Sequence, residues 1–117
     1  MFLLVMVLDD TNRLNDVLAA WQTAGVRGVT ILESTGLART LERHEARGAF
    51  AGFGAVFGGG RVGHNTLFAV VDDVAVAGVV AERVQSILGD LNKPNTGILF
   101  ILPVLAAWGL GVAVEQT

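Results

Sequence analysis

The sequence predicts an α+β domain whose elements follow the order strand, helix, strand, strand, helix, strand. Two similar strand–helix–strand units support this order, one within residues 1–35 and one within residues 64–104. Each contains an apolar strand, an Asp-Asp pair at the start of a helical pattern, and a second strand. An insert, residues 36–64, separates them. Connections of about thirty residues are uncommon in compact domains unless they are functional or disordered.

The first unit opens with Phe2–Leu8, a continuous apolar run that is typical of a central strand. The side-chain oxygens of residues 9–11 (Asp-Asp-Thr) are suited to cap the helix that follows. The apolar face of this helix recurs at helical spacing and consists of Leu14, Val17, Leu18 and Trp21. Gly25 is expected to end the helix, because glycine adopts the left-handed conformation at little cost. A strand is expected at Val29–Leu32.

The second unit repeats this pattern. A strand is expected at Thr66–Val71, and the Asp-Asp pair at 72–73 is expected to cap a second helix. The apolar stripe of this helix consists of Val76, Val80, Val84 and Ile87. Gly89-Asp90 marks its end, and Gly97–Val104 is expected to form a strand that ends near Pro103.

Right-handed crossovers would place both helices, each of about fourteen residues, on one face of a four-stranded antiparallel sheet. The expected fold is therefore a ferredoxin-like sandwich formed by the whole chain, 1–117, with a C-terminal extension at 105–117. Apolar residues make up 52% of the chain and charged residues 16%, so the second sheet face should also be apolar. Self-association is the economical way to cover it.

Composition also excludes several classes of function. The net charge of −3 disfavours nucleic-acid binding, which needs clustered Lys and Arg. The chain has no cysteine, so disulfides and thiolate metal sites are excluded. Residues 1–8 lack the basic start of a signal peptide, and Pro103, Gly109 and Gly111 interrupt the uncharged stretch Thr96–Val114. We therefore expect a chain that is not itself transmembrane.

The insert contains Phe50, Phe53 and Phe57 at helical spacing, interleaved with glycines that oppose an isolated helix. Two interpretations stay open for these aromatic residues. They pack locally within the insert, or they anchor a partner protein, as aromatic side chains often do.

With these elements in place, the chain resembles the divergent PII-like members of the nitrogen-regulatory PII superfamily. The resemblance rests on the element order, the TGLAR segment Thr35–Arg39, the VVDD helix entry Val70–Asp73 and the strand GILFILPV, Gly97–Val104. It implies a homotrimer with a ferredoxin-like fold and a long T-loop opened by a turn like Gly36–Arg39. It further implies adenine-nucleotide or small-effector binding between subunits and a target protein engaged by the T-loop.

The chain also departs from the pattern of this superfamily. It has no tyrosine, so modification of a T-loop tyrosine is excluded. Ile98 stands where the family has a phosphate-binding lysine, and no arginine follows the LPV segment. Lys93 matches an earlier lysine of the B-loop, the loop before the last strand. Each missing charge-assisted contact is worth about 1.5–3 kcal/mol, which argues against tight ATP binding in the usual pose and favours a mononucleotide or small anion.

The resemblance places the effector site at the insert base and the B-loop, with the residues Gly36, Leu37, Ala38, Arg39, Lys93, Thr96 and Gly97. Simpler interpretations remain: Arg39 can pair with Glu33 or Glu42 on the surface, and Gly36 can serve only the turn. The polar loop 92–97 can form an anion nest or a plain connection.

Other motifs are weaker. His44, Glu45 and His64 could hold a divalent metal, although their spacing matches no metal motif. The paired aspartates are expected to cap helices rather than to catalyse proton transfer. The glycines at 58–63 lack the GK[ST] ending of a phosphate loop.

The expected function is that of a cytoplasmic, non-enzymatic signal-transduction protein whose effector biases its loop toward or away from a target. The target would be a membrane transporter or an enzyme. A trimeric scaffold with a decayed effector site and a metal-binding protein on the same fold are the alternatives.

Overall fold

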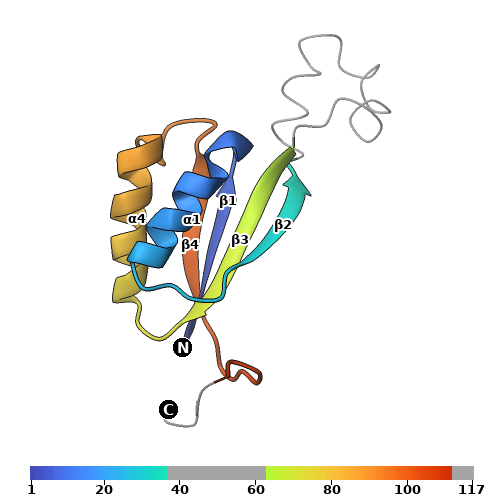
Figure 1. Cartoon of the computed structure of the whole chain (residues 1–117), viewed down its shortest axis with the longest axis vertical. Helices are drawn as coiled ribbons and strands as arrows, with labels where there is room; N and C mark the ends of the chain where they lie inside the picture. Colours follow the sequence, from blue (N-terminus) through green and yellow to red (C-terminus); the bar gives the residue numbers. More distant parts are fainter. Residues whose placement is uncertain (37–62, 112–117) are drawn as a thin grey trace.

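The computed structural model describes residues 1–36 and 63–111, and Figure 1 shows their arrangement. The elements are β1 (Phe2–Leu8), the 3₁₀ turn η1 (Thr11–Arg13), α1 (Leu14–Thr23), β2 (Thr30–Thr35), β3 (Gly63–Val71), α4 (Ala75–Leu88) and β4 (Gly97–Pro103). Together they form a small α+β fold with a four-stranded antiparallel sheet and two helices. This arrangement is compatible with the expected ferredoxin-like sandwich.

The sheet has the strand order β2-β3-β1-β4, so β1 is central, as its apolar run predicted. Its register is continuous from edge to edge. Val5 pairs with Phe68 of β3 on one side and with Phe100 of β4 on the other. At one end of the sheet, Leu8 pairs with both Asn65 and Gly97, so residues from all four strands align in rows.

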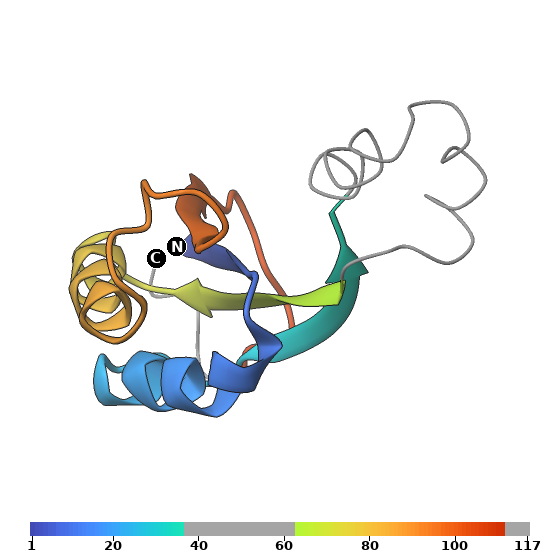
Figure 2. The ribbon, with the colours of Figure 1, turned by 90° about the horizontal axis from the view of Figure 1, so that it is seen from above.

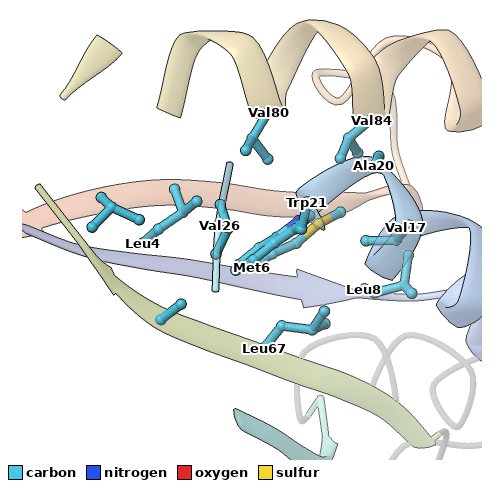
Figure 3. Packing of buried hydrophobic residues seen from close by; sticks show 12 residues of the cluster. Leu4, Met6, Leu8, Val17, Ala20, Trp21, Val26, Leu67, Val80 and Val84 are labelled. Carbon is cyan, nitrogen blue, oxygen red and sulfur yellow. The ribbon is translucent and has the colours of Figure 1, made fainter. Parts of the chain in front are cut away.

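Both helices lie on one face of the sheet (Figure 2), and the core fills the space between the two layers. Figure 3 shows how the aromatic ring of Trp21 lies among the aliphatic side chains of the strands and of α4. The buried apolar residues are Leu4, Met6, Leu8, Val17, Ala20, Trp21, Val26, Leu67, Ala69, Val71, Val80 and Val84. Leu14, Leu18, Val76 and Ile87 pack against this core, so the helical faces predicted from spacing are confirmed.

The expected capping aspartates and helix-ending glycines are also confirmed. Asp10 caps η1 by accepting a hydrogen bond from the Asn12 amide at 3.0 Å, and Asp73 accepts from the Ala75 amide at 2.9 Å. Gly25 has φ +98° just after α1, and Gly89 has φ +92° at the end of α4. Asp10 and Asp73 therefore have the helix-capping role that the sequence predicts for the two aspartate pairs.

Three boundaries differ from the prediction. The strand β2 runs from Thr30 to Thr35 and not over the expected Val29–Leu32, because its pairing with β3 continues to Thr35. The first helix has 10 residues after a separate 3₁₀ turn, shorter than the expected fourteen or so, because Thr11–Arg13 forms the tighter helix that often begins an α-helix. The strand β3 begins at Gly63, three residues before the expected Thr66. His64, which the sequence analysis assigned to the insert, is therefore a strand residue, because pairing with β2 extends β3 beyond its apolar segment.

The sheet face that the helices do not cover is mostly apolar. We call it the open face, and it consists of Leu3, Val5, Val7, Leu32, Phe68, Val70, Ile98, Phe100 and Leu102. Side chains alternate between the two faces of a strand, which is why these residues face away from the core. Several are widely exposed: Ile98 is 55% exposed and Leu32 51%. The expected second apolar face is thus present and uncovered within the described part of the chain.

After β4 the chain continues as an irregular segment, residues 104–111, which we call the tail. It is tied to the start of the chain because the Val104 amide donates a hydrogen bond of 3.0 Å to the Met1 carbonyl. Gly109 and Leu110 line a hollow with Phe68 and Val70 of the sheet. None of the helices in residues 1–36 and 63–111 is both long and apolar enough to cross a membrane.

Candidate functional site at the base of the insert

A polar cluster lies on the uncovered side of the sheet, where β2 and β3 border the insert. Ser34 and His64 are direct partners across the two strands, and Ser34 Oγ lies 2.6 Å from His64 Nδ1. The same oxygen lies 2.8 Å from the Thr66 hydroxyl. His64 is only 8% exposed. The three side chains therefore form one hydrogen-bonded group at one end of a sheet face that is otherwise mostly apolar.

Gly36, a predicted effector residue, lies directly against this cluster. A Cβ atom at position 36 would come 2.8 Å from His64 Nε2, closer than real Cβ contacts. Glycine is therefore needed here for close approach of the backbone to the imidazole, in addition to any role in a turn. The first and last residues of the expected insert, Gly36 and His64, thus meet in space.

A polar hollow of about 610 Å³ opens beside the cluster. Among the described residues it is lined by Thr11, Glu33, Ser34, Thr35, Gly63, His64 and Asn65. Asn65 is 8% exposed, and its Oδ1 has no hydrogen-bond partner. A buried amide oxygen without a donor is costly, so a ligand or water that donates a hydrogen bond there would be stabilised.

The lining contains the carboxylate Glu33, and the described residues add no lysine or arginine to it. Positive charge for an anionic effector would have to come from elsewhere. The candidates are Lys93, which precedes β4, and Arg39, which lies outside the described residues.

The loop that contains Lys93, Thr96 and Gly97 lies at the same end of the sheet but beside the opposite edge. Glu33, Asn65, Leu8 and Gly97 form one row across the four strands. Strands lie about 4.8 Å apart, so three spacings separate Glu33 from Gly97 by about 14 Å. The two predicted halves of the effector site are therefore not adjacent within one chain.

The backbone amides at the beginning of this loop are already engaged. The Lys93 amide donates to the Asp90 carbonyl at 3.0 Å, and the Asn92 amide to Asp90 Oδ1 at 2.9 Å. The Leu91 amide donates to Gln85 Oε1 at 3.0 Å. These three amides therefore serve the helix-to-strand connection and are not free to form an anion nest.

The packing of the sheet explains why position 97 is a glycine. Its φ is +143°, and a Cβ there would lie 2.5 Å from the Val7 carbonyl oxygen. Close packing of β4 on β1 therefore requires glycine at this position. Thr96 is half-buried beside it, and Lys93 is exposed.

The remaining predicted residues lie outside the described part of the chain: Leu37, Ala38, Arg39, His44, Glu45, Phe50, Phe53 and Phe57. Their proposed roles in effector, metal and partner binding stay predictions. Within residues 1–36 and 63–111, no group of three or more His, Cys, Asp or Glu is placed to hold a metal ion.

Sequence reasoning missed Ser34, Asn65 and Thr66. The only signal for them was their position just beside the insert, at the ends of strands that also contain apolar residues. Whether Ser34 meets His64 depends on the β2–β3 register, which strand patterns alone do not give across an insert.

Comparison with known proteins gave no matching family model and no curated protein with significant similarity. The resemblance to the PII superfamily thus remains a prediction that rests on the residues quoted for it.

Proposed function

We propose that the chain is a non-enzymatic, trimeric signalling protein of PII-like type, with a ferredoxin-like fold and a T-loop-like insert. It would bind a small effector, either an adenine nucleotide or a small anion, between subunits. The insert would then be presented to a target protein, a transporter or an enzyme, in the cytoplasm.

The observation that carries this proposal is the open face. An apolar sheet surface of this kind is unfavourable in water and is usually covered by another chain. The sheet spans about 19 Å across four strands and about 23 Å along a strand of seven residues, or about 440 Å². Exposed apolar patches of this size on a monomer are often functional.

The separation of the two predicted site halves supports an effector site between subunits. About 14 Å lies between the insert base and the loop before β4 in one chain. A small anion cannot bridge that distance. Neighbouring copies can bring the loop of one subunit to the insert base of the next, where Lys93 would supply positive charge to the polar hollow.

Regulation requires that the effector prefer one state of the insert over another. The contact of Gly36 with His64 offers a place where such a preference could arise, because a ligand in the hollow would touch the residues that hold both ends of the insert. Deleting Gly48–Gly60 should abolish target binding and leave a folded trimer.

The test combines light scattering with a thermal-shift screen against ATP, ADP, AMP, cyclic AMP, bicarbonate and divalent metals. A ligand at a hundred times its Kd adds about 2.7 kcal/mol to the free energy of unfolding. A trimer with one selective shift supports the proposal. A monomer contradicts it, whereas a trimer with a flat response favours the scaffold alternative, and a shift with a metal alone favours a metal-binding protein.

A further inference from the structure

The tail carries two large apolar side chains that are almost fully exposed. Leu105 is 97% exposed and Trp108 is 90% exposed. Trp21, the other tryptophan, is fully buried in the core. Complete exposure of a tryptophan on a folded segment is unfavourable, and such side chains are typical anchors of interfaces.

The tail also lies next to the open face. It follows β4 directly, is held to Met1 by the Val104 hydrogen bond, and reaches Phe68 and Val70 through Leu110. Figure 1 shows it beyond the sheet end that is opposite the insert. The exposed Leu105 and Trp108 therefore lie on a segment that borders the open face.

We propose that Leu105 and Trp108 of one copy dock on the open face of a second copy, so that the tail forms part of the subunit interface. This inference rests on the self-association in the proposed function and adds the segment that secures it. The occupant of the open face is thus the same chain, through its sheet and its tail.

A contact that includes the tail buries more apolar surface than a contact between sheets alone. The open face offers about 440 Å² in flat projection, whereas each partner in a stable complex buries about 800 Å². A buried tryptophan contributes about 150–250 Å². Trp108 and Leu105 would therefore supply much of the surface that the open face lacks.

The receiving surface offers a matching cavity. The hollow beside the tail has a volume of about 430 Å³ and is lined by Phe68, Val70 and Leu110, with Arg27 and Asp72 among its other residues. A guanidinium can stack on an indole ring, and a carboxylate can accept a hydrogen bond from indole Nε1. The hollow thus has the chemistry to receive Trp108 of a neighbour.

The test compares the wild-type chain with Leu105→Asp and Trp108→Ala by light scattering at micromolar concentration. Both residues are exposed in the single chain, so these substitutions should leave the fold and its far-UV circular dichroism unchanged. Loss of an interface anchor should raise the Kd of assembly at least about 30-fold. Val74→Asp is the matched control, because Val74 is 53% exposed beside α4, on the layer away from the open face.

Acrylamide quenching provides a second measurement, since buried Trp21 should be protected in every variant. Trp108 should be protected in assembled wild-type protein and accessible in Leu105→Asp. An assembled wild type with Trp108 freely quenched would overturn the inference, as would variants that assemble like the control.

The outcomes separate the two proposals. A monomeric wild type contradicts both. A wild-type trimer that survives Leu105→Asp and Trp108→Ala but dissociates with Ile98→Asp overturns only the role of the tail. Tail variants that keep the trimer but lose binding to phosphatidylcholine vesicles would show that the tail meets lipid instead of a second copy.

Discussion

Ser34 and His64 face each other across β2 and β3, with 2.6 Å between Ser34 Oγ and His64 Nδ1. Thirty positions separate them in sequence, and the insert lies between them. The hydrogen bond therefore closes the base of the insert on the sheet. Loss of this hydrogen bond should loosen both ends of the insert together.

Ser34→Ala should lower the free energy of unfolding by about 1–3 kcal/mol, because His64 Nδ1 and the Thr66 hydroxyl lose their shared partner at a half-buried site. Urea denaturation measures the change. Thr35→Ala is the control, since Thr35 is an exposed residue of the same strand. Equal stability of the two variants would contradict a structural role for the cluster.

Gly36→Ala should destabilise the insert base by about 1–3 kcal/mol, because the new methyl group would collide with the His64 ring. Hydrogen exchange should show faster exchange at the paired amides of residues 34 and 64. Gly63→Ala is a close control, since a Cβ at Gly63 meets nothing within 4 Å. The prediction fails if both alanine variants exchange alike.

Gly97→Ala should cost more than Gly89→Ala, although both glycines have positive φ. Alanine at 89 has only a backbone cost of about 1–3 kcal/mol, because φ +92° with ψ −173° is a conformation that glycine alone normally adopts. The space around position 89 is empty, so no clash adds to this cost. Alanine at 97 adds a clash with the Val7 carbonyl, worth about a further 1–3 kcal/mol. Thermal unfolding of both variants gives the comparison, and a smaller loss for Gly97→Ala would refute the account.

Lys93 is the only lysine of the chain, so a dimethyl-lysine signal can be assigned to it without ambiguity. Reductive methylation with ¹³C-formaldehyde keeps its charge and labels it, together with the N-terminal amine, for NMR. An anionic effector that binds near Lys93 should shift the dimethyl-lysine signal, and Lys93→Gln should weaken binding by about 1.5–3 kcal/mol. Addition of sodium chloride at equal ionic strength controls for screening. An effector that stabilises the protein yet leaves this signal unmoved would remove Lys93 from the site.

Local patterns in the sequence were enough to predict most of the helices and strands, but not all of their ends. The apolar run Phe2–Leu8, the helical spacing around Trp21 and the capping residues Asp10 and Asp73 all have causes within a few neighbouring residues. The uncovered apolar face was predicted from the composition of the chain and from continuous apolar runs such as Phe2–Leu8.

The site could be predicted only in part, because its geometry depends on contacts between distant segments. Sequence reasoning selected Gly36 and Gly97 for a ligand, whereas the structure gives each a steric reason to be glycine. The meeting of Ser34 with His64 required the strand register, and the exposure of Trp108 required the path of the tail. No local sequence pattern predicts the close contacts at the two glycines, the contact of Ser34 with His64 or the exposure of Trp108.

The hydrogen bond between the Val104 amide and the Met1 carbonyl brings the beginning of β1 and the end of β4 together. A short glycine-rich peptide could therefore join position 104 to position 1, while the chain is opened within residues 37–62. Such a circular permutant would keep every strand pair of the sheet and would present the two halves of the insert as free arms. If this permutant folds, the sheet and helices can assemble without an unbroken insert between β2 and β3.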